Sequence, residues 1–382
     1  WLPAAGNLVV RCDSSTALNP GDRAVVRGKI YPFTARHGGY GRLMTRRGYV
    51  GTLYLNRSSL LLSDTLHREL SPKHLSLFLH ERAVARLDRL ALAPDEQALC
   101  NAMTAGDRRS LSPALRAAYS RSGTSHLLAV SGLHVGIVFL LANLLLWWLP
   151  LFRHGHILRN IAVILLIWLY AATTGFPPSV VRAALMFSVL QFALASSSEY
   201  VGMNTLAGVA FVMLLFHPDY LFDISFQLSF IAVAGIIAWG LPLCRLLRTR
   251  RKSIDMLTAT LAIGFSASAA TAPLISHTFG QISVVGLALN PVVILLSYVV
   301  VGSCTLWLVI PGTALAPLFS VVAGFAARAQ NELIRAAAAL PAAALDIRLT
   351  TTQCWIVYGL FIFATLLLWS AERKKSVSSL PE

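Results

Sequence analysis

A series of long apolar segments begins at Leu127 and continues almost to the end of the chain. An α-helix of about 20 apolar residues is long enough to cross the hydrocarbon core of a bilayer. Soluble domains carry about 25% charged residues, whereas this chain of 382 residues carries 13%, with 56% hydrophobic residues. The sequence therefore predicts a polytopic α-helical membrane protein. About nine transmembrane or re-entrant helices are expected, over 127–149, 157–174, 178–197, 204–217, 221–243, 256–277, 281–310, 313–330 and 352–370.

The residues before these segments are polar and basic. Residues 1–126 carry 18 Lys and Arg against 9 Asp and Glu, so they hold +9 of the total charge of +15. The runs LVVRC, RAVVRGKIY and YVGTLYL, with turn signals between them, predict strands of a small, partial β-barrel. Because no basic and apolar leader precedes this part, we expect the sequence to begin within a longer protein. Four regions are predicted: a partial β domain (1–70), an amphipathic helical connector (71–126), a transmembrane domain (127–371) and a basic tail (372–382).

Three basic clusters follow or separate the apolar segments: RHGHILR (153–159), RLLRTRRK (245–252) and ERKK (372–375). With nine spans and the polar region outside, all three clusters face one side of the membrane. Loops rich in Lys and Arg stay in the cytoplasm. The pattern predicts an extracytoplasmic N-terminal region and a cytoplasmic C-terminus.

Several segments contain residues that a plain membrane anchor avoids. A charge or a helix break in a membrane is costly unless it lines a cavity or finds a partner. Each has a structural alternative. Arg182 could extend to the interface, Gln227 could join two helices, and Asn290-Pro291 could connect two re-entrant halves. Together these residues favour a pathway for a polar solute. They are Pro178, Arg182, Asp223, Gln227, Asn290 and Pro291.

The stretch SGTSHLLAVSGLHVGIV (122–138) places His126, Ser131 and His134 at the start of the first apolar segment. A serine and a histidine three residues apart on a helix suggest a hydrolase, but no GxSxG turn and no acidic partner accompany them. The two histidines lie too far apart on one helix to share a metal, and the five cysteines show no CxxC spacing. We therefore expect no enzyme activity, no metal and no cofactor. Whether Cys12 pairs with Cys100 stays open.

Four motifs, in order, resemble the competence domain of the ComEC family: GTSHLLAVSGLHVGIV, GFPPSVVRAALMF, PDYLFDISFQLSFIAVAGI and ISVVGLALNPVVIL. The similarity covers roughly 95–310, with AGDRRSL (105–111) as a weaker upstream match, and GDRAVVRGKI fits the family's extracytoplasmic OB-like domain. The resemblance implies a channel that passes one strand of incoming DNA through the bacterial inner membrane into the cytoplasm. Many members also carry a metallo-β-lactamase-like domain, but no HxHxDH run occurs here. No nuclease chemistry is assigned to this chain.

Site residues follow from this resemblance and from the polar positions. The membrane interior has essentially one well-placed cation, Arg182. Such a pore suits a sliding polyanion such as DNA, because conduction needs sites that bind the passing molecule weakly enough to release it. Asp223 is expected to pair with Arg182 and set the pore geometry. The residues expected to line or gate the path are Ser131, Gly132, His134, Gly136, Arg182, Gln227 and Asn290. A structural or gating role is expected for His126, Pro178, Asp223 and Pro291.

The expected partners are single-stranded DNA, the lipid bilayer, a DNA receptor outside and a cytoplasmic helicase or translocase, since no ATP-binding motif is present. A separate nuclease and a homo-oligomer stay open. The first alternative function is a secondary transporter of a smaller anionic solute, with Arg182 as its counter-ion. An internal repeat would favour it, and none is visible. The second is a non-conducting membrane scaffold of the DNA-uptake machinery, which would tolerate Arg182→Ala.

Overall fold

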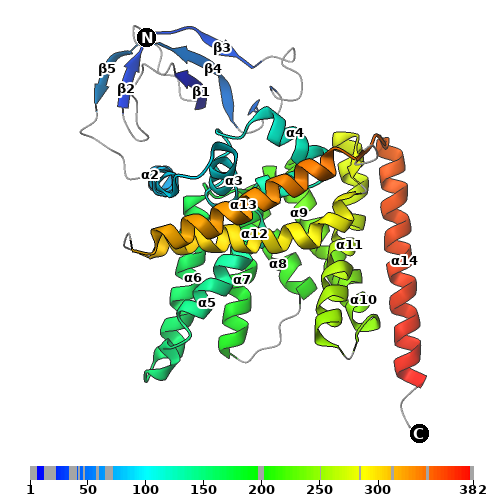
Figure 1. The fold of residues 1–382 in the computed structure, drawn as a ribbon. Coiled ribbons are helices and arrows are strands. Elements are labelled where there is room, and N and C mark those ends of the chain that lie inside the picture. Colours follow the sequence, from blue (N-terminus) through cyan, green and yellow to red (C-terminus); the bar gives the residue numbers. More distant parts are fainter. Residues whose placement is uncertain are drawn as a thin grey trace.

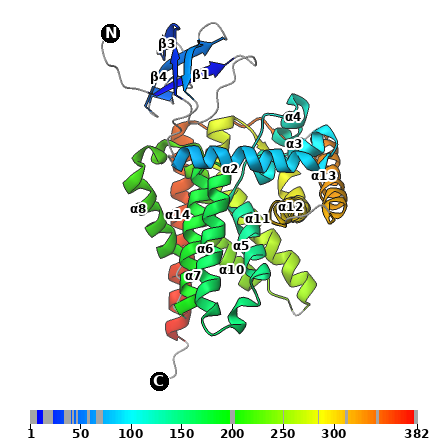
Figure 2. The same cartoon turned by 90° about the vertical axis from the view of Figure 1, so that its left-hand side faces the viewer.

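A computed structural model describes residues 7–12, 23–33, 41, 44–45, 48–56, 60–64, 72–196, 202–249, 251–283, 285–310, 314–340 and 344–378. Figure 1 shows a small group of strands at one end of a helical body, with the C-terminus at the opposite end. The helices form two sets. One set stands side by side along the long direction of the body, and the other lies across it (Figures 1 and 2).

The strands make two small sheets. In the first, β4 pairs with β1 in parallel and with β3 in antiparallel fashion, and in the second β2 and β5 are antiparallel. Along β4, buried Leu53 and Leu55 flank exposed Tyr54, as expected for a strand with one buried face. Strands form in all three predicted runs, but RAVVRGKIY divides into β2 and β3, which belong to different sheets; barrel closure stays a prediction. The bounds are β1 Asn7–Cys12, β2 Arg23–Val26, β3 Ile30–Pro32, β4 Tyr49–Leu55 and β5 Leu60–Asp64.

A layer of helices lies across the body, on the side that faces the strands. In it, α12 and α13 run crosswise in Figure 1 and α2 runs crosswise in Figure 2, and α3 and α4 pack with them. Their shared core includes Leu99, Met103, Tyr119, Val300 and Ile334. The bounds are α2 Pro72–Leu87, α3 Pro94–Thr104, α4 Pro113–Arg121, α12 Val285–Val309 and α13 Ala316–Ala338. We call this set the crosswise layer.

The second set, the upright helices, carries most of the apolar segments. These helices are α5 Gly132–Leu145, α6 Gly155–Thr173, α7 Pro178–Ser196, α8 Gly202–Phe216, α9 Ile224–Gly235, α10 Leu241–Leu246, α11 Lys252–Phe279 and α14 Thr351–Ser378. Short elements connect the helices: η3 Asp88–Leu90, η4 Ser125–Leu128, η5 Leu149–Leu151, η6 Pro218–Phe222, the π-helical η7 Ile236–Gly240, β6 Ile282–Ser283 and β7 Ala344–Leu345. Because η7 joins α9 to α10, the two form one continuous rod.

Five segments of the described residues are long and apolar enough to cross a membrane. They are Gly132–Leu151, Gly155–Thr173, Ile224–Leu246, Ile254–Phe279 and Leu289–Val309. Three shorter apolar helices cover Pro178–Leu194, Gly202–Phe216 and Thr351–Leu366. These lengths and compositions support the helical membrane class, whereas the predicted count of about nine spans is not confirmed.

Two of the predicted spans differ from expectation. The Asn-Pro break expected in 281–310 is absent from the described part of that segment, because α12 continues from Val285 to Val309 with Pro291 inside it. Buried Val293, Val300 and Cys304 pack this helix into the core, and tertiary packing of this kind sustains a helix that has lost one backbone bond to proline. The segment over 313–330 becomes the first part of α13, which lies along α12.

The three basic clusters share one end of the body. The α5–α6 connection, the α10–α11 connection and the last turns of α14 all lie at the end opposite the strands (Figures 1 and 2). This agrees with the predicted common side of 153–159, 245–252 and 372–375.

Candidate functional site

The starts of α5 and α7 are held together on the side of the crosswise layer. Pro178 occupies the first position of α7, where its missing N–H costs no helical bond. The next residue, Ser179, donates its hydroxyl to the carbonyl of Val130 at 3.0 Å. Ser131 and Gly132 follow directly and begin α5. Pro178 thus begins α7, and the bond from Ser179 fixes the start of α7 against that of α5.

His134 accepts a hydrogen bond that caps α5. The backbone N–H of Ser131 donates to Nδ1 of His134 at 2.9 Å, and the Ser131 hydroxyl lies 3.3 Å from the same nitrogen. Because Nδ1 accepts an N–H, the proton of the neutral imidazole is on Nε2. The ring is fully buried, and Nε2 has no hydrogen-bond partner among the described residues. The Ser-His spacing thus serves a capping box, an arrangement that satisfies a helix end.

Arg182 lies buried where α5, α7 and α9 meet. Only 6% of its surface is exposed. Its Nη1 is 3.5 Å from the Met186 sulfur, and its Cζ is 5.8 Å from the centroid of the Phe230 ring on α9. A guanidinium above an aromatic face is attracted by the ring quadrupole. The side chain therefore does not extend to an exposed interface, as one sequence-based alternative had it.

Gly132 and Gly136 face α7 and allow it to approach. A Cβ atom on Gly132 would lie 2.8 Å from Nη2 of Arg182, and one on Gly136 would lie 3.3 Å from the Phe187 ring. Small residues four apart on a helix are typical of close helix packing in membranes. The two glycines therefore leave room for side chains of α7.

Asp223 and Gln227 both organise the start of α9. The Asp223 carboxylate accepts from the backbone N–H of Ser225 at 2.8 Å and of Phe226 at 3.2 Å, which makes it the N-cap. The Gln227 side chain donates to the carbonyl of Leu221 at 2.7 Å. Both groups therefore have local structural roles. Pairing of Asp223 with Arg182 stays a prediction.

The remaining predicted residues lie around this centre. His126 is in η4, just before α5, and it is exposed. Asn290 and Pro291 are in α12, where the Asn290 Oδ1 is buried and has no hydrogen-bond partner among the described residues. The contact between α5 and α7 brings together Ser131, Gly132, His134, Gly136 and Arg182. Asp223 and Gln227 lie at the start of neighbouring α9. Asn290 lies on α12, in the crosswise layer.

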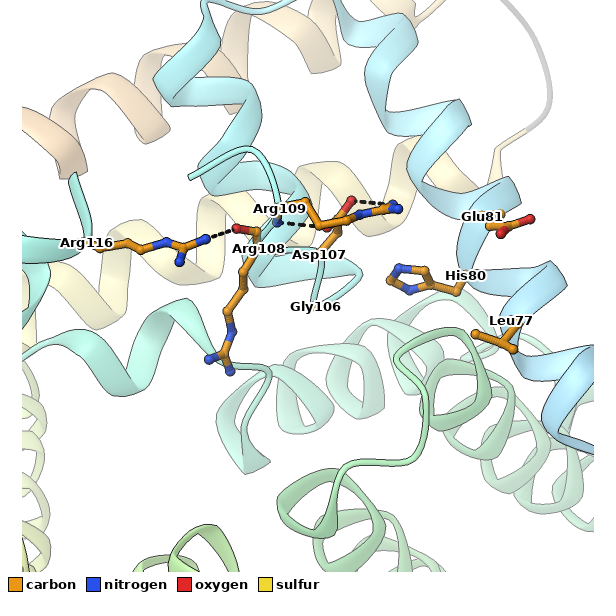
Figure 3. A pocket seen from close by; sticks show the side chains of 8 residues that line it. All are labelled: Leu77, His80, Glu81, Gly106, Asp107, Arg108, Arg109 and Arg116. Atoms are coloured by element: carbon orange, nitrogen blue, oxygen red, sulfur yellow. Dashed lines mark hydrogen bonds and ion pairs between the residues drawn. The ribbon is translucent and has the colours of Figure 1, made fainter. Parts of the chain in front are cut away.

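A hollow at the outer side of these helix starts was missed by sequence reasoning. It has a volume of about 490 Å³ and is bounded by Leu77, His80 and Glu81 of α2, the turn Gly106–Arg109, and Arg116 of α4. Figure 3 shows these residues on the three elements around the hollow. The only sequence signal was the motif AGDRRSL, which supplies the turn. The partners on α2 and α4 have no fixed spacing from it.

An ion pair fixes the turn of this hollow. Arg109 binds the buried Asp107 carboxylate through Nε and Nη2, both at 2.9 Å, and its backbone N–H donates to the same carboxylate at 3.0 Å (Figure 3). The hydrogen bonds from Arg109 hold the pKa of Asp107 below its ordinary value. Gly106 precedes this pair with a φ of +83°, a conformation that favours glycine.

Comparison with known proteins decides the family. A family model described as Competence protein matches residues 103–374, which is more than half of the chain. The chain belongs to the competence protein family. Over 204 residues it is 33% identical to ComE operon protein 3 of Bacillus subtilis (strain 168), covering 52% of this chain and 24% of that protein. Together the two matches support a ComEC-like competence protein, as the four motifs predicted.

A second relative is an uncharacterized protein of Aquifex aeolicus (strain VF5), 29% identical over 201 residues, which cover 52% of this chain and 45% of that protein. This chain thus spans less than half the length of either of these curated relatives. No solved structure matches.

Proposed function

We propose that this chain forms a channel that passes a single DNA strand across the bacterial inner membrane during natural transformation. The observation that carries the proposal is Arg182, a cation 6% exposed among apolar helices of a competence-family chain. Burying a charge is costly in free energy, so a membrane protein keeps one where a partner or a passing ligand uses it. A phosphate chain is such a ligand.

The charges at the two ends of the body support a direction of transport. The three basic clusters lie at the end opposite the strands (Figure 1), and positively charged loops stay in the cytoplasm. The strands and the crosswise layer would then face outward. Residues 1–126, with a net charge of +9, would concentrate DNA there through release of counterions.

In this proposal the chain itself carries out no covalent chemistry. Capping accounts for the contact between Ser131 and His134 without a nucleophilic role. The driving force would come from a cytoplasmic motor protein or from the membrane gradient, and a receptor outside would deliver the DNA.

The test follows fluorescent DNA in cells and scores the signals outside and inside the inner membrane separately. Strains carry the unaltered chain, a deletion, Arg182→Ala, Arg182→Lys or His134→Ala, at equal membrane abundance. We expect DNA to reach the cell surface in the Arg182→Ala strain and to stop there, with partial rescue by Arg182→Lys. Arg328→Ala is the matched control, because Arg328 is 72% exposed and pairs with Glu96 on the crosswise layer.

Each alternative predicts a different result. Normal import in Arg182→Ala cells combined with loss of import in the deletion strain would favour the non-conducting scaffold. Normal DNA import in the deletion strain, with loss of uptake of a small anion, would favour the secondary transporter. Either result would contradict the proposed channel.

A further inference from the structure

The hollow lined by Arg108 and Arg116 sits directly outside the Arg182 site. A Cβ atom on Gly106 would lie 3.3 Å from the Val130 side chain, so the turn rests on the residue before the α5 cap. The carbonyl of Val130 binds Ser179 at the start of α7. The floor of the hollow is therefore next to the paired starts of α5 and α7. Arg182 follows Ser179 by three residues in α7, so it lies close to this floor.

The charges around the hollow are unequal on its two sides. On one side Asp107 and Arg109 neutralise each other, with His80 and the carboxylate of Glu81 beside them. On the other side are Arg108 and Arg116 (Figure 3). Neither of these two has a carboxylate within ion-pair distance in the part of the chain that the structure describes. One side of the hollow thus holds two positive charges with no counter-charge from those residues.

Arg108 and Arg116 are also held close together. An Nη2 of Arg116 donates to the carbonyl of Arg108, which anchors α4 to the turn (Figure 3). Partial burial and the nearby charge of Arg116 lower the pKa of Arg108. Figure 3 shows the Arg108 side chain pointing away from the Asp107–Arg109 pair. An anion placed between the two guanidinium groups would relieve their repulsion.

We propose that Arg108 and Arg116 form a binding site for one phosphodiester group of the incoming DNA strand, immediately outside Arg182. Planar guanidinium groups bind phosphate oxygens through paired hydrogen bonds. The volume of about 490 Å³ falls within the range of roughly 300–1,000 Å³ that is usual for ligand sites. This inference rests on the proposed function, because the strand must pass this point before it reaches Arg182.

The test measures binding of a fluorescent 12-nucleotide oligothymidylate to the purified chain in phosphatidylcholine nanodiscs at several salt concentrations. Arg108→Gln is the main variant, since no hydrogen bond of the Arg108 side chain holds the described fold. We expect it to weaken binding about tenfold and to reduce the slope of log K against log salt by about 0.7, the value for one phosphate contact with a single strand. Arg108→Lys should restore most of both. Arg121→Gln, an exposed arginine at the end of α4 that does not line the hollow, should bind normally.

Unchanged affinity and salt slope in Arg108→Gln would overturn the proposal. The variant and the unaltered chain could also differ in oligonucleotide affinity only when the nanodiscs contain phosphatidylglycerol. That result would assign the hollow to a lipid headgroup and would also overturn the proposal. The channel is tested separately by DNA import in Arg182→Ala cells. If Arg108→Gln binds the oligonucleotide normally while Arg182→Ala still blocks import, only the proposed phosphate site is refuted. If the deletion strain imports DNA normally, the channel is refuted, and oligonucleotide binding at the hollow is unaffected by that result.

Discussion

The crosswise layer and the upright helices bury polar groups in different ways. In the layer, the Tyr119 hydroxyl donates to Oδ1 of Asn331 at 3.1 Å and accepts from Nε2 of Gln330 at 3.2 Å. In the upright helices, His134 buries an Nε2 without a hydrogen-bond partner among the described residues, and Arg182 packs against a ring and a thioether. The layer also buries Oδ1 of Asn290 and Oε1 of Gln330 without a hydrogen-bond partner among the described residues, so such atoms occur in both regions. The two regions differ in charge, because the buried polar side chains of the layer's helices are neutral, whereas the upright helices bury a cation, Arg182. We therefore expect the layer to act as scaffold and the upright helices to carry the function.

The largest effect is expected from Arg182→Ala. We predict at least about a hundredfold fewer transformants, because the buried positive charge for the strand is gone. Truncation also removes the contacts of the side chain with Met186 and Phe230, so import is compared at equal abundance of folded protein. Counting transformants and quantifying the protein in the membrane would check the prediction. A loss of import that only matches a loss of protein would instead place Arg182 with the scaffold.

Gly132→Ala should have the next largest effect. The new Cβ would lie 2.8 Å from Nη2 of Arg182, so the guanidinium must move. We expect about tenfold less DNA import at equal protein abundance. The matched control is Gly208→Ala in α8, where a Cβ meets no atom within 4 Å. Equal import in the two variants would show that the position of the guanidinium does not matter.

Tyr119→Phe tests the scaffold. It removes the hydroxyl that joins Asn331 and Gln330 and leaves their buried amide groups without this partner. The free energy of unfolding should fall by about 1–3 kcal/mol, and DNA import should fall only in proportion to protein abundance. Thermal unfolding and quantitative blots would measure the two. A loss of import without a loss of stability would contradict the division of roles.

Asp107→Asn should lower stability in a manner that depends on pH. Because Arg109 lowers the folded-state pKa of Asp107, the ion pair stabilises the fold above the unfolded pKa of about 3.9. That contribution is lost as pH falls through the folded-state value. We expect the variant to be less stable by about 1–2 kcal/mol at pH 7 and the difference to shrink below about pH 4. A difference that is constant with pH would show that the carboxylate charge is not the cause.

The smallest effect is expected from Arg328→Ala. Arg328 is 72% exposed and lies 3.1 Å from Glu96, and exposed ion pairs contribute about 0–1 kcal/mol. Thermal unfolding at low and high salt should show a small difference that vanishes with salt. A larger loss would mean that the crosswise layer depends on its surface charges.

Local patterns in the sequence predicted much of this structure. The start of α7 at Pro178 and the strands β1 and β4 depend on residues close together in the chain, whose preferences are read directly. The location of the three basic clusters at one end of the body also followed from their positions between and after the apolar segments. Family membership followed from four motifs in sequence.

What the sequence did not predict depends on packing between distant segments. Leu289–Val309 of α12 is long and apolar enough to cross a membrane, as predicted, but apolar content does not tell whether a helix stands upright or lies crosswise. The contacts that decide its direction come from α3 and α13. Likewise, the hollow around Arg108 requires a three-dimensional arrangement that spacing does not encode. By contrast, the N-cap bonds of Asp223 reach only two and three residues along the chain, so this role was a local signal that sequence reasoning missed.

The most direct test of the central claim asks whether a translocating strand touches the α5–α7 contact. Cells carrying Ser131→Cys would import DNA with a thiol-reactive group on its backbone, and covalent adducts would be counted against cells with only the native cysteines. Gly208→Cys, on the open face of α8, is the matched control. The account predicts adducts with Ser131→Cys alone. Import of the same DNA with no adduct above background at residue 131 would contradict it.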